Sequence, residues 1–120
     1  MNNKINLCEV ESLLSKRIEN IYQEQLKHKL DNVYYKIFDR TLIVIIEGSI
    51  TTPEKVLESN DRHWLARQVR KAIDDVIHPQ IKTIIEEVME VEVTDFMSDT
   101  TINNNITGAI AILGFKSNKD

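Results

Sequence analysis

The stretch Thr41-Leu42-Ile43-Val44-Ile45-Ile46-Glu47 decides the fold, because its consecutive apolar and β-branched residues predict a strand. A half-exposed strand alternates apolar and polar side chains, whereas residues 42–46 are apolar at every position. This pattern predicts that both faces of the strand are buried. Residues 33–38 are also rich in β-formers, and Asp39-Arg40 predicts a short hairpin loop that joins the two strands.

Two further strands are expected near the carboxyl end. Residues 91–97 alternate in part, and residues 106–115 combine apolar with small side chains. The polar residues 98–105 between them predict a loop. Together the four strands predict a mainly antiparallel sheet in which residues 41–47 and 106–115 occupy the centre, because both are apolar on both faces.

Helical periodicity accounts for the rest of the chain. Apolar residues at spacings of three and four predict a helix from about Cys8 to Lys27. Thr51-Thr52-Pro53-Glu54 has the capping residue, the early proline and the early carboxylate of a helix start, and this short helix ends near Asn60-Asp61. A long apolar pattern follows from Leu65 to Val88. It stays in phase across Pro79, which predicts one kinked helix.

The expected fold class is therefore α+β, a four-stranded mainly antiparallel sheet with a long N-terminal helix and a kinked central helix packed on it. The element order is helix, strand, strand, helix, helix, strand, strand, in a single domain over residues 1–120 with a core of about 9–114. Helices on one side leave the other sheet face bare, so either another helix or a second subunit must cover it. We expect a homodimer.

Composition excludes several classes of protein. The chain has 120 residues and a net charge of −4, which disfavours a nucleic-acid binder. It has one cysteine, Cys8, so neither an internal disulfide nor a cysteine-based zinc site is expected. The longest apolar run, residues 42–46, is far shorter than the roughly 20 residues of a membrane span, and residues 1–6 do not resemble a secretory signal. We therefore expect a cytoplasmic protein that does not insert into a membrane.

One basic cluster is the candidate binding site. It consists of Arg62, Arg67, Arg70 and Lys71, with Trp64, the single tryptophan, among them. Helical spacing puts the last three charges on one side, where they would bind an anion, a nucleotide phosphate or an acidic partner. The alternative, which we favour, is ion pairing with Glu58, Asp74 and Asp75 at helical spacing. Trp64 is either an interface anchor or, as we expect, a core residue.

The remaining reactive residues do not form a catalytic pattern. His28, His63 and His78 are expected on the surface or at helix ends, and Asp99 is expected to end the third strand and cap the polar loop. The paired carboxylates predict solvated helix faces. The isolated glycines form no phosphate-binding loop, and no nucleophile motif is present. We expect no enzyme activity, no cofactor and no metal ion.

Several segments nevertheless resemble one family. Residues 47–54, Glu-Gly-Ser-Ile-Thr-Thr-Pro-Glu, are similar to the strand end and Leu-Thr-Pro-x-Glu-type helix start of the MpsC-like family, small bacterial proteins named after a sodium-translocating, membrane-potential-generating system. Residues 65–70 resemble its Val-Arg-x-x-Arg stretch, and residues 85–93 its Val-Glu-Glu-Leu-Thr-Gly-x-x-Val segment. Ser98-Asp99 stands where the family has Ser-Asp. The resemblance spans about residues 9–114 and is strongest to short, cyanobacterial-type members.

The chain departs from the family pattern in two places. Lys27-His28-Lys29-Leu30 stands where many members carry Gly-Arg-Gly-Pro, so a ligand of that glycine-rich segment would be lost here. Met89-Glu90 stands where many carry Thr-Gly after the long helix. The resemblance implies no catalytic residue or cofactor.

Three hypotheses of function follow, and the last of them is an enzyme of unknown type. The first is a non-enzymatic accessory or regulatory domain that binds a protein partner, which the family name implies is a membrane transport complex. The second is a sensor of a small anion or nucleotide, held between helices and sheet by the same arginines.

Overall fold

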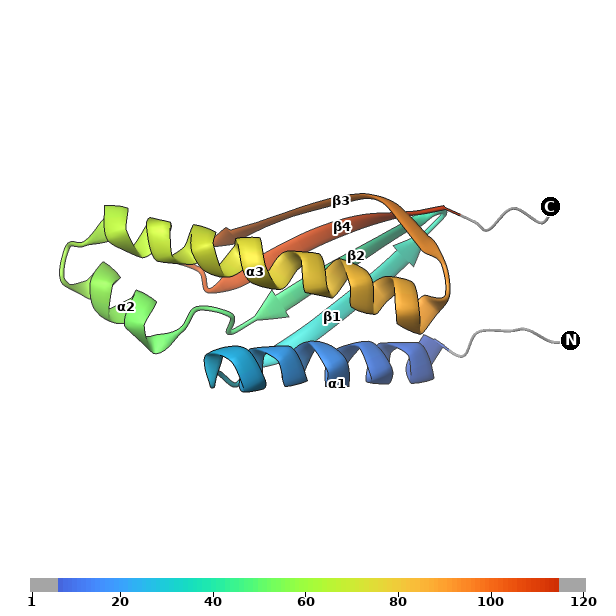
Figure 1. The fold of residues 1–120 in the computed structure, drawn as a ribbon, viewed down its shortest axis with the longest axis horizontal. Helices are drawn as coiled ribbons and strands as arrows, with labels where there is room; N and C mark the ends of the chain where they lie inside the picture. Colours follow the sequence, from blue (N-terminus) through green and yellow to red (C-terminus); the bar gives the residue numbers. More distant parts are fainter. Residues whose placement is uncertain (1–6, 115–120) are drawn as a thin grey trace, which may run out of the picture.

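The computed structural model describes residues 7–114, which form three helices and four strands (Figure 1). The elements are α1 (Leu7–Leu26), β1 (Asn32–Phe38), β2 (Thr41–Glu47), α2 (Thr52–Ser59), α3 (His63–Met89), β3 (Glu92–Thr101) and β4 (Ile106–Gly114). This confirms the α+β class and the expected order of elements.

The four strands form one antiparallel sheet in the order β1-β2-β4-β3. Val44 of β2 pairs with Tyr35 of β1 on one side and with Ala109 of β4 on the other. Strands β2 and β4 are therefore central, as the apolar runs predicted. The edge strands β1 and β3 each pair along one side only.

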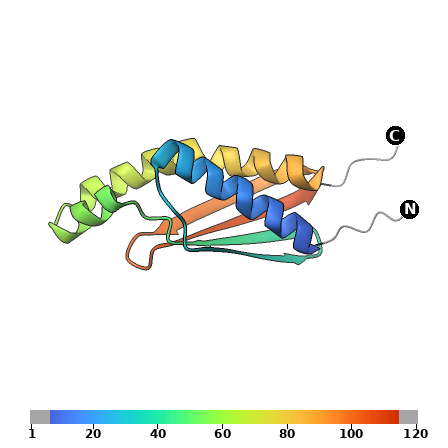
Figure 2. The same cartoon turned by 90° about the horizontal axis from the view of Figure 1, so that it is seen from below.

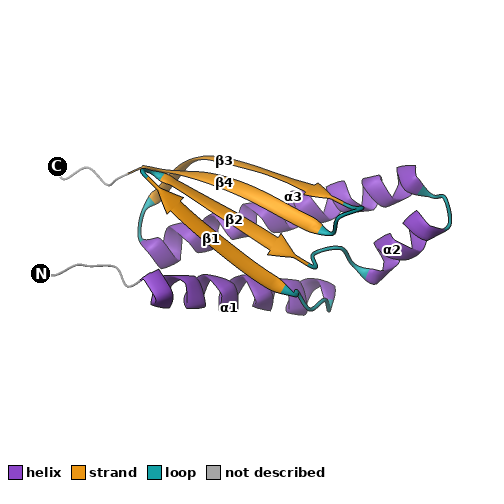
Figure 3. Ribbon diagram, turned by 180° about the vertical axis from the view of Figure 1, so that it is seen from behind, coloured by secondary structure: helices purple, strands orange, loops and turns teal. Residues whose placement is uncertain are grey.

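Helices α1 and α3 lie side by side on one face of the sheet (Figure 2). The core lies between the two layers, where Ile18 of α1, Ile81 of α3 and Val44 of β2 are fully buried. Burying each such side chain stabilises the fold by roughly 1.5–3 kcal/mol. The expectation that both faces of residues 41–47 are buried is therefore wrong, because they are fully buried on the helix side only. Their other side chains are half-buried, because no helix covers that face (Figure 3).

Helix α2 and the first turns of α3 extend beyond the end of the sheet (Figures 1 and 3). Thr51 precedes α2, and the backbone N–H of Thr51 donates to the Glu54 carboxylate at 2.9 Å, as in a capping box. Pro79 lies inside α3, which continues as one helix and bends over the sheet (Figure 2).

The third strand, β3, has other bounds than residues 91–97, which the sequence predicted. It continues to Thr101, so the connection to β4 is residues 102–105 rather than 98–105, and Asp99 lies within the strand instead of ending it. Residues 98–101 are polar because β3 is an edge strand whose inner side meets polar groups. Ser98 contacts His78, and the Thr100 hydroxyl lies 2.7 Å from that of Thr107. The Asp99 carboxylate accepts the backbone N–H of Thr100 at 2.9 Å.

Candidate functional site

A buried ion pair joins the two helices of the projecting end. Glu54 is completely buried on α2, and Arg70 on α3 is 4% exposed. Arg70 donates from Nε to Oε2 and from Nη2 to Oε1 of Glu54, both at 2.7 Å, and from Nη2 to the Ser49 carbonyl at 2.9 Å. This bidentate geometry suits arginine and not lysine.

Polar contacts continue from Arg70 along α3 to the edge strand. Arg70 Nη1 donates to Asp74 Oδ1 at 2.9 Å, and the same oxygen lies 3.2 Å from His78 Nε2. The other ring nitrogen of His78, Nδ1, lies 2.5 Å from the hydroxyl oxygen of Ser98. We call Glu54, Arg70, Asp74, His78 and Ser98 the polar network.

The charges in the polar network stabilise one another. Burial alone would raise the pKa of Asp74, but the close contact with His78 and the hydrogen bond and charge of Arg70 outweigh it and lower that pKa below its ordinary value. Burial likewise opposes the charge of Arg70, yet its bonds to Glu54 and Asp74 raise its pKa. Both groups are therefore charged at neutral pH.

The network borders a groove between α3 and β3. The groove has a volume of about 1000 Å³, and the side chains of Arg67, Lys71 and Lys82 line its helix side. Asp99 and Thr100 of β3 line the other side, and His78 and Ser98 lie between the two. Both cations and carboxylates line this groove, so it carries no strong excess of either charge.

The structure separates the residues of the predicted basic cluster. Arg70 forms ion pairs with Glu54 and Asp74 within the polar network, and Lys71 Nζ lies 3.4 Å from Asp75 Oδ2. The ion-pair interpretation therefore holds for Arg70 and Lys71. Glu58 instead contacts His63 at 2.7 Å. Arg62 and Arg67 are exposed at the projecting end.

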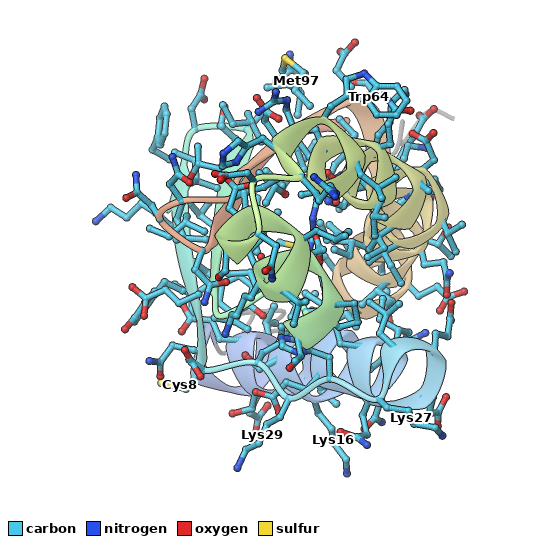
Figure 4. All side chains as sticks on the ribbon, turned by 90° about the vertical axis from the view of Figure 1, so that its left-hand side faces the viewer. Cys8, Lys16, Lys27, Lys29, Trp64 and Met97 are labelled. Atoms are coloured by element: carbon cyan, nitrogen blue, oxygen red, sulfur yellow. The ribbon has the colours of Figure 1, made fainter. Side chains whose placement is uncertain are left out.

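Trp64 is not a core residue, contrary to expectation. It is 68% exposed on the first turn of α3. Figure 4 looks onto the projecting end and shows its ring pointing away from the body of the molecule. The apolar spacing of α3 begins one residue later, at Leu65, but the first turns of α3 lie beyond the sheet, where there is no core to enter.

His78 also departs from the prediction, because it is buried in the middle of α3 rather than exposed. His28 and His63 do lie near helix ends, after α1 and at the start of α3. Sequence reasoning missed the link from His78 to Ser98, since it joins residues of two elements. One available signal was the i, i+4 series Arg70, Asp74, His78, which puts three polar groups on one helix face.

The fold and groove define a two-layer α+β domain with a charged groove along one sheet edge. The chain belongs to the MpsC family, described as "Na+-translocating membrane potential-generating system (MpsC)", whose model matches residues 7–114. No curated protein and no solved structure matches the chain. Among residues 7–114, no helix combines the length and the apolar character needed to cross a membrane.

Proposed function

We propose that this protein is a non-enzymatic accessory component of a membrane-potential-generating system, acting from the cytoplasm by docking onto a protein subunit of that system. Membership of the MpsC family supports the link to such a system. One observation carries the docking role, the 68% exposure of Trp64 at the end of the molecule that projects beyond the sheet.

The surroundings of Trp64 suit a protein contact. Arg62 and Arg67 are exposed near it, and Val56 of α2 is 52% exposed. Tryptophan and arginine dominate the residues that carry binding energy in protein interfaces, and an exposed tryptophan contributes little to the fold of its own chain. We call Val56, Arg62, Trp64 and Arg67 the helical tip. Its partner surface would offer an apolar pocket beside carboxylates.

Capture of partners from solubilised membranes tests this proposal. The tagged protein is expected to recover a membrane transport subunit in stoichiometric amount, and Trp64→Ala and Arg67→Glu are each expected to reduce that recovery by about tenfold or more. Lys16→Glu on the exposed side of α1 is the matched charge control and should recover as much as the wild type. Equal recovery by all three variants would refute the role of the helical tip.

The non-enzymatic part of the proposal has its own support. Asp74, His78 and Ser98 contain the residue types of a hydrolase triad, but Asp74 is bonded to Arg70, and its approach to His78 lacks hydrogen-bond alignment. A fluorophosphonate probe, which labels activated serines, is therefore expected to leave Ser98 unmodified. Labelling that disappears in Ser98→Ala would contradict this.

The groove favours one second candidate, a sensor of a small anion. Arg67, Lys71 and Lys82 lie along its helix side and could bind a phosphate group. A ligand that binds only the folded state raises the melting temperature. Inorganic phosphate and ATP are the first probes, and no shift at millimolar concentration of either would remove this candidate.

A further inference from the structure

The face of the sheet opposite the helices is apolar across all four strands. Figure 3 looks onto this open face, which no helix of the described chain covers. Its apolar residues include Tyr34, Phe38, Ile43, Ile45, Met97 and Ile110. Phe38, Met97 and Tyr34 are 55%, 53% and 51% exposed, and a contiguous apolar patch of this kind marks an interaction surface.

The open face covers a substantial part of the area of a standard interface. Strands of seven residues and four strands side by side give a flat footprint of about 23 by 19 Å. This footprint is about 440 Å², roughly half of the 800 Å² that each partner contributes to a standard interface, and the longer strands β3 and β4 and the relief of the side chains add to it.

Near the middle of the open face the charges lie on opposite edges, while Glu47 of β2 lies at the end of the face beside Tyr34. Lys36 lies on β1, and Asp95 and Asp99 lie on β3. The strand register puts Lys36 level with Met97 across the sheet. Asp95 and Asp99 precede and follow Met97 by two residues along β3, so their carboxylates flank the level of the lysine. All three side chains are exposed, and within residues 7–114 none of them makes an ion pair.

We infer that the open face binds a second copy of this chain, with the two-fold axis parallel to the strands. This axis places β1 of each copy over β3 of the other, and β2 over β4. Lys36 of one copy then faces Asp95 and Asp99 of the other, and the same contact occurs twice, as an isologous interface requires. The central isoleucines stack between the sheets at the spacing of about 10 Å found in β-sandwiches.

The alternative axis, perpendicular to the strands, is disfavoured by the same charges. It would place β1 over β1 and β3 over β3, which brings like charges together on both edges. Like charges opposed across an interface suppress an association. The charge pattern therefore selects one orientation, and a partner other than a second copy would have to reproduce that pattern.

The molar mass in solution is the first test. Size-exclusion chromatography with light scattering at tens of micromolar should give twice the 13.9 kDa of the chain. Ile110→Glu places a charge at the centre of the face and should raise the dissociation constant by about tenfold or more. Val76→Glu is the matched control, because Val76 is 56% exposed on α3, away from this face, and its mass should stay dimeric. A monomeric wild type would overturn the inference.

A charge-swap experiment tests the orientation. Lys36→Glu makes the β1 edge acidic like the β3 edge. Asp95→Lys with Asp99→Lys makes the β3 edge basic like the β1 edge. Each variant alone should therefore be monomeric, because like charges then face each other. A mixture of the two variants should form a one-to-one dimer, because every facing pair is then of opposite charge. The perpendicular axis would also pair opposite charges in this mixture, so the single variants decide the orientation. If Lys36→Glu alone stays as dimeric as the wild type, this orientation is refuted. Circular dichroism of each variant confirms that it is folded. Trp64→Ala should leave the mass unchanged, which separates this inference from the proposed docking role.

Discussion

Arg70 binds Glu54 through two parallel hydrogen bonds of 2.7 Å, at a place where Glu54 is fully buried and Arg70 almost so. Glu54 also accepts the backbone N–H and the hydroxyl of Thr51, so its carboxylate receives bonds from three directions. The pair fixes α2 against α3 and thereby positions the helical tip. The two segments that resemble the MpsC family around these residues each contribute one partner.

Removing one partner of this pair should be strongly destabilising. Glu54→Ala leaves Arg70 buried without its main counter-charge, and we expect it to lower the free energy of unfolding by about 3–5 kcal/mol. Arg70→Lys should also lose stability, since lysine cannot form the bidentate contact. The double variant Glu54→Leu with Arg70→Met should be more stable than Glu54→Ala. Urea unfolding measures all four, and additive losses in the double variant would contradict the pairing.

Asp74 should make the free energy of unfolding depend on pH in the acidic range. Its pKa is lowered in the folded state, so its contribution is present above the unfolded value near 3.8 and is lost as the pH falls through the folded value. We expect Asp74→Asn to be less stable at pH 7 and to lose less stability than the wild type between pH 5 and pH 3. Asp75→Asn, at an exposed pair, should shift stability by less than about 1 kcal/mol. Parallel urea titrations at each pH decide this, and identical acid sensitivity in wild type and Asp74→Asn would argue against it.

The hydroxyl of Tyr22 should be dispensable at neutral pH. Tyr22 is fully buried on α1, and its hydroxyl has no hydrogen-bond partner among the described residues, so Tyr22→Phe should be neutral or stabilising. Burial raises the pKa of Tyr22 to about 12, so the wild type should lose stability as the pH rises from 10 towards 12, and Tyr22→Phe should lose less. Tyr35→Phe is the control, because its hydroxyl lies 3.1 Å from that of Ser15. It should cost about 1 kcal/mol at pH 7. A large loss in Tyr22→Phe would show that its hydroxyl does have a partner.

Gly48 should not tolerate a side chain. Its φ is 82°, and an added Cβ would lie 2.8 Å from the backbone nitrogen of Asp31. Gly48→Ala therefore combines a strained backbone, which costs about 1–2 kcal/mol, with a clash that moves the segment between α1 and β1. Gly108→Ala is the control, since the nearest atom to its Cβ is 3.6 Å away. Thermal unfolding should show a large loss for the first and a small change for the second, and equal melting temperatures would contradict this.

Replacing Glu90 by glycine should stabilise the fold. It ends α3 with a φ of 57°, in the left-handed region, at the position where many family members carry the glycine of Thr-Gly. Glu90→Gly removes a backbone strain of about 1–2 kcal/mol, partly offset by the greater freedom of glycine in the unfolded chain. We expect a net gain of about 0.5–1 kcal/mol. Thr83→Gly, at an exposed helical position of α3, should instead lose about 0.3–0.5 kcal/mol. A destabilised Glu90→Gly would show that the glutamate side chain stabilises this turn.

Local patterns predicted most of the fold. The consecutive apolar residues 42–46 and the small residues of β4 placed the central strands, and Thr51 to Glu54 marked the start of α2 within a residue. The errors lie where tertiary contacts override local pattern. Residues 98–101 look like a loop because the partner of Ser98 is a buried histidine far along the chain. Helical spacing alone could not show that α3 begins beyond the sheet, which is why Trp64 was expected in the core.

The candidate site was predictable only in part. Spacing identified the ion pairs of Arg70 and Lys71 with acidic residues one turn further along α3. The pairing of Arg70 with Glu54 spans two helices, and nothing in the separation of the two residues indicates it. A charge that is buried and one that is exposed look alike in a sequence, so the division of the basic cluster into a structural arginine and an exposed tip required the fold.

The strand order has a consequence for how the chain folds. β1 with β2, and β3 with β4, are hairpins that close over short loops, whereas β2 meets β4 only after the whole α2–α3 segment has been brought back. Closing a long loop costs conformational entropy before any contact repays it, and such non-local pairings slow folding. Pairing of β2 with β4, which joins two preformed hairpins, is therefore expected to be the rate-limiting step of folding. Substitutions in this pairing should slow refolding more than substitutions within either hairpin.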